Sequence, residues 1–315
     1  MIELIVTCFI ILAISLSAWL GTSLTRTNVV TYKSHDGVYV SGYHKGVLTL
    51  YNKDQTAFST TLPHNSGEDS FLAKYDNEGN VKWVTGQSSS SNDVGKSIST
   101  DRNGNVYVGG YYTTSLDLYS KNSTTSSAQL TGTGRDGFIA KYDKDGNVVW
   151  AAKQGSTPPA SANLKSLKIS TDRNGNVYIA GEFYGNITFY KKDNTPGISF
   201  TGSTYDGFIA KYDKDGNVVW AAKQSGSGTE ISYDVSTDRY GNVYIAGDYY
   251  TNTPITLYNS DDSTGVTLSS NGDDAFLAKY DSDGNIKWAA SQTSTGVEYT
   301  VPNSVSSYYY LEEVQ

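Results

Sequence analysis

The sequence predicts an all-β fold of tandem repeats, preceded by one long hydrophobic α-helix. One observation is that DGFIAKYDKDGNVVWAAKQ occurs at residues 136–154 and again, unchanged, at residues 206–224. A second is composition: charged residues make up only 18% of the chain, which has 26 Tyr and 31 Gly. Such a composition is typical of short strands joined by polar turns. A third is that residues 4–24 carry no charge.

The N-terminal segment, residues 1–26, is expected to form the helix. Its uncharged run would span about 30 Å as a helix, which is long enough to cross a bilayer. The opening MIELIV, with Glu3, resembles the start of type IV pilins. This resemblance implies that Glu3 pairs with the terminal amine of a neighbouring subunit and that the helices bundle into a filament core. In that family the glutamate is usually the fifth mature residue, whereas here it is the third. A single-span anchor and a signal peptide stay open as alternatives.

A module of about 68 residues fills the rest of the chain, residues 27–315. The motif F-[LI]-A-K-Y-D recurs at intervals of 67, 70 and 68 residues, and a tryptophan follows it at the same intervals. Periods of this size indicate stacked or radial repeat arrays. The motif starts at Phe71, Phe138, Phe208 and Phe276, and the tryptophans are Trp83, Trp150, Trp220 and Trp288.

Each module reads as a series of β-hairpins. FIAKYD alternates apolar and polar residues, KDGN turns the chain and VVWAAK returns, which predicts a first hairpin. A second hairpin is predicted at residues 97–112, 168–183 and 234–249, and a looser third pair at residues 187–200.

The two ends of the array predict a closed ring. Residues 29–43 match the second hairpin with no FIAKYD hairpin before them, and the last first hairpin ends near Ala290. If the terminal strands complete one shared sheet, closure removes exposed strand edges. Residues 301–310 are a candidate for a further strand of that sheet. The expectation is a four-bladed wheel closed by N- and C-terminal strands.

Two motifs, Y-D-x-D-G-N-[VI]-x-W and D-x-x-G-N-V-Y-[VI]-x-G, recur in order through the array. They resemble the bacterial β-propeller repeat family called SBBP, over about residues 29–310. The resemblance implies a β-propeller fold with binding or surface roles, and it implies no reaction.

Charge and reactive residues exclude several classes of function. The net charge of −8 and the pI near 4.9 argue against a nucleic-acid partner, which needs a basic stripe. The only cysteine, Cys8, excludes a disulfide framework. His35, His44 and His64 are irregularly spaced and are interpreted as surface imidazoles. No residue stands in the context of an activated nucleophile, so neither an enzyme nor a cofactor is expected.

The acidic turns offer two interpretations. The spacing D-x-D-G-N matches the start of an EF-hand calcium loop, but no glutamate stands at the twelfth position. Turn chemistry explains the same residues, because Asp and Asn tolerate turn geometry and Gly supplies a positive φ. We favour the turn and keep calcium as the alternative. The residues are Asp143, Asp145, Asn147, Asp213, Asp215, Asn217, Asp281, Asp283 and Asn285.

Aromatic residues are the best candidates for contact. The four repeated tryptophans fit either the packing between sheets or a ring that stacks carbohydrate, and we favour packing. The tyrosine doublets are expected to be exposed and to contact glycans or neighbouring subunits; these are Tyr111, Tyr112, Tyr249 and Tyr250. Asn122 and Asn186 begin N-glycosylation sequons, in keeping with an outside location.

The favoured function is structural. The chain is expected to be extracellular or at the cell surface, as the subunit of a homo-oligomeric filament that assembles through its N-terminal helices. The alternative is a secreted or membrane-anchored module that binds a surface glycan or a protein.

Overall fold

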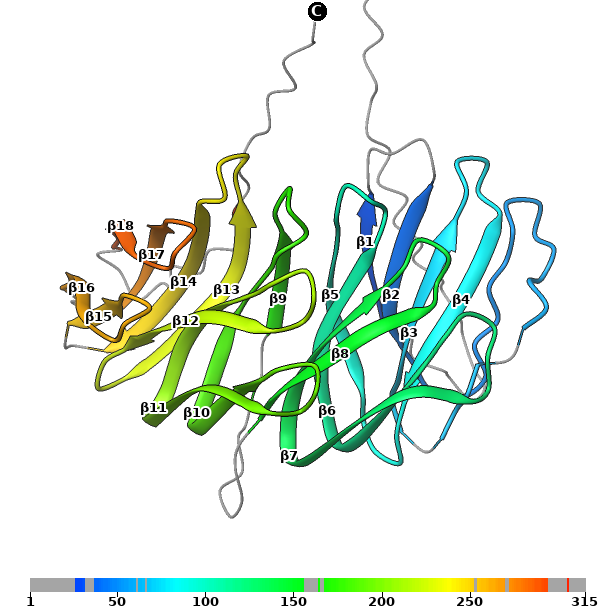
Figure 1. The fold of residues 1–315 in the computed structure, drawn as a ribbon, viewed down its shortest axis with the longest axis horizontal. Helices are drawn as coiled ribbons and strands as arrows, with labels where there is room; N and C mark the ends of the chain where they lie inside the picture. Colours follow the sequence, from blue (N-terminus) through cyan, green and yellow to red (C-terminus); the bar gives the residue numbers. More distant parts are fainter. Residues whose placement is uncertain are drawn as a thin grey trace, which may run out of the picture.

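The computed structural model describes residues 26–31, 37–60, 62–65, 67–155, 164, 167–251, 254–269, 272–293 and 305. Their regular secondary structure consists of 18 β-strands (Figure 1). Within these ranges there is no helix with the length and apolarity needed to cross a membrane. Glu3 and the predicted helix lie outside them, except Arg26, which begins strand β1 instead of ending a helix.

Sixteen of the strands form four antiparallel units of four strands each, in chain order. Unit 1 contains β1 (Arg26–Thr31), β2 (Val38–His44), β3 (Asp69–Tyr75) and β4 (Val81–Ser88). Unit 2 contains β5 (Val94–Thr100), β6 (Val106–Tyr119), β7 (Ser126–Tyr142) and β8 (Val148–Gly155). Unit 3 contains β9 (Leu167–Thr171), β10 (Val177–Tyr190), β11 (Pro196–Tyr212) and β12 (Val218–Ser225). Unit 4 contains β13 (Thr229–Thr237), β14 (Val243–Thr251), β17 (Gly272–Tyr280) and β18 (Ile286–Gln292).

An outer hairpin connects each of units 2–4 to the unit before it. In units 2 and 3 it is the continuation of the second and third strands, and in unit 4 it is β15 (Ile255–Tyr258) with β16 (Thr264–Leu268). Each hairpin pairs over two residues with the last strand of the preceding unit, as in Gln87↔Leu118 and Ser88↔Asp117. These links join units 1–3 and β15–β16 into one 14-stranded sheet, beside the four-stranded sheet of unit 4.

The repeated D-x-D-G-N sequence forms the tight turn between the third and fourth strands. In unit 2 the backbone N–H groups of Asp145 and Asn147 both donate to Oδ1 of Asp143, at 3.0 and 2.8 Å. Gly146 has φ +85°, in the left-handed region that a side chain disfavours. The turn therefore needs this order of residues for its shape.

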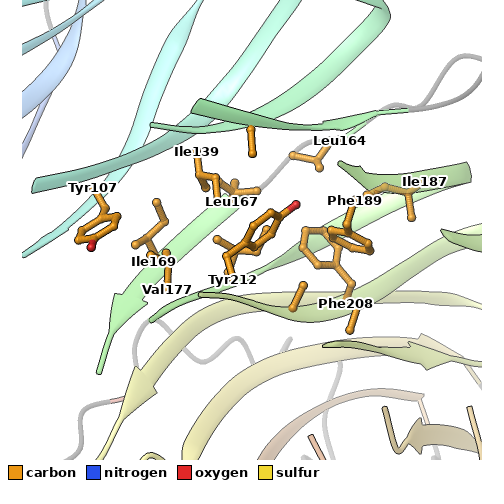
Figure 2. Close-up of a cluster of buried hydrophobic side chains, with 14 of the residues drawn as sticks. Tyr107, Ile139, Leu164, Leu167, Ile169, Val177, Ile187, Phe189, Phe208 and Tyr212 are labelled. Atoms are coloured by element: carbon orange, nitrogen blue, oxygen red, sulfur yellow. The ribbon is translucent and has the colours of Figure 1, made fainter. Parts of the chain in front are cut away.

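The hydrophobic core lies between units. Figure 2 shows the cluster at the junction of units 2 and 3, where Tyr107 and Ile139 of unit 2 meet residues of unit 3 such as Leu167, Ile169 and Tyr212. Equivalent clusters join unit 1 to unit 2 and unit 3 to unit 4. Each four-stranded sheet thus buries its apolar faces against its neighbours, as stacked repeats do.

The array is open, so the predicted closed four-bladed propeller is wrong. Among the described strands, β1 pairs only with β2 and β18 pairs only with β17, and no ladder joins unit 1 to unit 4. Figure 1 shows the units fanned out along an arc with units 1 and 4 at its two ends.

The prediction of a closed ring failed because it began the repeated unit at the wrong hairpin. Each unit consists of a second hairpin followed by an FIAKYD hairpin, as in β5–β6 and β7–β8. Residues 29–43 therefore begin a whole unit, and β18 ends one, so no shared sheet is needed. Residues 301–310 lie outside the described residues except Val305, whose backbone N–H donates to Oδ2 of Asp234 in β13 at 2.8 Å.

Candidate functional site

The repeated tryptophans hold neighbouring units together. In three of them the indole N–H donates to a backbone carbonyl in the D-x-D-G-N turn of the next unit, at 3.3, 3.1 and 2.9 Å for Trp83, Trp150 and Trp220. These three side chains are 4–5% exposed, so they belong to the packing between units and cannot form a ring that stacks carbohydrate. Trp288 of unit 4 differs, with 40% exposure.

In the acidic turns, the first aspartate already accepts hydrogen bonds from the backbone of the same turn. Asp143, Asp213 and Asp281 each accept two backbone N–H groups on Oδ1. Asp145 and Asp215 form exposed ion pairs with the lysines that precede them. In the described part of the chain, no group of three or more His, Cys, Asp and Glu side chains is arranged to hold a metal ion. This geometry supports the turn interpretation.

The tyrosine doublets are split between the core and the surface. Tyr112 and Tyr249 have no exposed area, so their expected role as exposed contacts is wrong. Tyr111 and Tyr250 are half-buried at the surface. The cause is the strand itself, because adjacent residues point to opposite faces of a sheet.

One of the places where the units differ from one another is an edge that we name the variable edge. It lies where the second strand of each unit meets the third, at the end of the sheet opposite the D-x-D-G-N turns. The side chains that face each other there differ in every unit. The four pairs are Lys45 with Glu68, Thr113 with Arg135, Tyr184 with Tyr205, and Tyr250 with Asp273.

In unit 2 the variable edge is cationic and aromatic. The Arg135 guanidinium lies 3.7 Å from the centroid of the Tyr111 ring, and Nζ of Lys96 lies 5.4 Å from it. Burial raises the pKa of Tyr111, Arg135 opposes this, and Glu68 of unit 1 adds to it. The edges of units 1 and 2 lie close together, because the backbone N–H of Asp93, just before β5, donates to the Glu68 carbonyl at 2.6 Å.

Units 3 and 4 carry different chemistry. In unit 3 the rings of Tyr184 and Tyr205 have centroids 5.3 Å apart, and Tyr184 is 48% exposed. In unit 4, burial raises the pKa of Asp248 to about 6, while hydrogen bonds with Tyr250 and Tyr233 oppose the rise. Burial also raises the pKa of Tyr250 to about 12.

Buried acids lie directly behind the variable edge. An aspartate two residues before each repeated phenylalanine is 0–2% exposed: Asp69, Asp136, Asp206 and Asp274. At two junctions the next unit adds a second acid. Burial raises the pKa of Asp93 to about 8, with Asp69 adding to the rise, and it raises the pKa of Glu230 to about 8, with Asp206 adding to it. Because these carboxyl groups are enclosed, they act on stability and offer no site for a substrate.

These acids were not predicted from the sequence, although the spacing Asp-x-Phe in every unit could have revealed them. The prediction of a surface imidazole is wrong for His44, which is 1% exposed and whose Nδ1–H donates to the Gly46 carbonyl at 2.7 Å. Burial lowers the pKa of His44. His64 is at the surface, with Nδ1 2.6 Å from Oδ2 of Asp69, and His35 lies outside the described residues.

The asparagine side chains of both sequons are exposed. Asn122 occupies a turn with φ +53°, and Asn186 lies on β10 beside an irregularity in its pairing. An oligosaccharide at either residue would project into solvent.

Residues 82–114, from β4 to β6, match the family model described as SBBP, beta-propeller repeat. A relative named "Uncharacterized WD repeat-containing protein L264", from Acanthamoeba polyphaga mimivirus, is 30% identical over 318 residues, covering 85% of this chain and 22% of the relative. "Regulatory protein FlaEY" of Caulobacter vibrioides is 29% identical over 192 residues, covering 61% of this chain and 18% of the relative. The chain thus spans about a fifth of the length of these relatives.

A solved structure of a protein of unknown function from Bacteroides caccae is 10% identical, covering 75% of this chain and 94% of that one. The TM-score of the two structures is 0.26. The family match covers residues 82–114, and the four-stranded unit to which they contribute strands recurs through the described part of the chain.

Proposed function

We propose that this protein is a non-enzymatic binding module that holds a glycan or protein ligand along the variable edge. The observation that carries the proposal is where the units differ. Their tryptophans and turns are almost the same, whereas the pairs at the variable edge change from unit to unit. A scaffold that is constant in its packing and varied at one edge is suited to presenting several different contacts to one ligand.

The residue types at this edge support recognition. Tyr and Arg are enriched among the residues that dominate binding energy, because they combine apolar area with hydrogen-bonding groups. Tyr184 offers an exposed ring, and Arg135 stacked on Tyr111 offers a fixed cation. The acidic residues of unit 4, with Asp273 beside Tyr250, add the opposite charge.

We also propose an extracellular or cell-surface location, which the exposed sequons at Asn122 and Asn186 support. The filament role expected from the pilin-like segment depends on Glu3, which lies outside the described residues. No contact in the described ranges favours that role, so binding is the better-supported proposal.

The test is a glycan array and a panel of surface proteins probed with the full-length chain. For any ligand found, Tyr184→Ala and Arg135→Ala should each weaken binding by about tenfold, as expected for contacts near the centre of an interface. Tyr240→Ala is the matched control, because Tyr240 is 69% exposed in the β13–β14 turn, away from the variable edge. Binding that survives both edge variants, or that is lost with Tyr240→Ala, would contradict the proposal.

A further inference from the structure

Unit 4 exposes a face that every other unit buries. Trp288 is 40% exposed, whereas its three equivalents are 4–5% exposed. Leu277 is half-buried, whereas Leu72, Ile139 and Ile209 have no exposed area. Gln292 is exposed, although the equivalent side chains Gln87, Gln154 and Gln224 are fully buried. The outward face of unit 4 is therefore an interface without its partner among the described residues.

Unit 1 leaves exposed the other half of the same interface. Tyr75 is half-buried, whereas the equivalent Tyr142, Tyr212 and Tyr280 have no exposed area. In unit 2, a Cβ at Gly146 would lie 2.8 Å from Cδ2 of Trp83. At the equivalent Gly79 it would meet only Lys53 of the same unit. Among the described residues, no tryptophan covers the turn at residues 76–80 as Trp83, Trp150 and Trp220 cover the turns of units 2–4.

Two hydrogen bonds recur where consecutive units meet. One is the indole N–H bond to the next turn, as between Trp150 and the carbonyl of Lys214 at 3.1 Å. The other runs from Nε2 of a glutamine to a tyrosine hydroxyl, from Gln87 to Tyr142 at 2.8 Å and from Gln154 to Tyr212 at 3.1 Å. Unit 4 presents the tryptophan and the glutamine of this arrangement. Unit 1 presents the tyrosine and the turn.

We propose that two copies of this chain join head to tail, with Trp288 of one copy packed on the turn at residues 76–80 of the other, and Gln292 beside Tyr75. A second copy fits because each end carries the half of the interface that the other end needs. One chain cannot pair its own ends, since units 1 and 4 lie at opposite ends of the arc (Figure 1). The contact continues an interface that the chain already builds three times.

Head-to-tail pairing at both ends would produce a ring of two copies. Interfaces of this heterologous kind give closed rings when the rotation between subunits closes. The ring would contain eight units, which is within the range of known propellers. It would also cover the exposed face of unit 4 and the exposed turn of unit 1.

The test uses the full chain with Cys8→Ser and one introduced cysteine carrying a spin label. One sample is labelled at residue 78 (Glu78→Cys) and another at residue 287 (Lys287→Cys). The reference is a single chain labelled at residues 219 and 283, the equivalent positions in units 3 and 4. We expect the mixture of the two samples to give the reference distance by pulsed electron resonance, and light scattering to give the mass of two copies.

Trp288→Ala should weaken the association at least tenfold, and Gln292→Ala, at an exposed position that folding does not require, should weaken it less. Val149→Ala is the control, because Val149 is 52% exposed but lies on unit 2. Circular dichroism checks that each variant folds. A monomer at every accessible concentration would overturn the proposal and indicate that a further repeat unit is the occupant. Association without the reference distance, as contacts through residues 1–25 would give, would overturn it as well.

Discussion

At the residue scale, the least expected feature is the buried acids between units. Asp93 and Glu230 are fully enclosed and each lies near a second carboxyl group, so both retain a proton in the folded chain up to about pH 8. In the unfolded chain they ionise near their ordinary values, about 4. Protons are thus held more tightly by the folded state, and stability must depend on pH.

The prediction is that stability falls as pH rises from about 4 to about 8 and levels off above that range. The sign follows from linkage: between the two pKa values the unfolded chain binds fewer protons than the folded chain, so rising pH favours unfolding. The two groups together should account for a loss on the order of a few kcal/mol. Melting temperatures measured at pH 5 and pH 8 give the wild-type change.

The double variant Asp93→Asn with Glu230→Gln isolates the effect, because neither amide titrates. Its melting temperature should fall less between pH 5 and pH 8, by roughly 5–10 °C less than the wild type. Asp145→Asn, at an exposed turn position, should leave the wild-type slope unchanged. An equal slope in the double variant and the wild type would show that these acids do not couple folding to pH.

At the element scale, the hairpins could be predicted from the sequence. Which side chains of their strands are buried could be predicted only in part. The alternation in FIAKYD and the Gly of KDGN both act locally, so the strands and turns of the first and second hairpins are confirmed. Exposure depends on what packs from other strands, in the same unit or the next. Tyr112 is enclosed by residues far away in the chain, such as Phe138, which no local pattern reveals.

Because the turn of the next unit covers Trp150 but no described turn covers Trp288, replacing each by alanine should change the stability by different amounts. Trp150→Ala should lower the free energy of unfolding by about 3–5 kcal/mol, because it leaves a cavity and an unpaired carbonyl at Lys214. Trp288→Ala should cost about 1 kcal/mol or less in dilute protein, since the side chain is 40% exposed. Chemical denaturation at low protein concentration measures both values. Equal losses would refute the idea that the next unit completes each tryptophan site.

At the scale of the whole molecule, the all-β class and the tandem repeats followed from the sequence, but the closure did not. A repeat has no intrinsic starting point, so hairpins alone do not say which two share a sheet. The pairing of β6 with β7 fixes the phase, and that pairing depends on contacts between residues up to 36 positions apart, as in Val106↔Tyr142. With the phase fixed, the described residues form four whole units, and no described strand is left to be shared between the first unit and the last.

The openness of the array is tested most directly by the distance between its ends within one chain. Chains carrying spin labels at both residues 78 and 287, in the Cys8→Ser background, are diluted with unlabelled protein so that only distances within a chain are seen. Chains labelled at residues 219 and 283 give the distance for adjacent units. An open arc predicts a much longer distance for the 78–287 pair than for the adjacent pair. Equal distances would mean that unit 1 meets unit 4 within one chain, and the open array would be wrong.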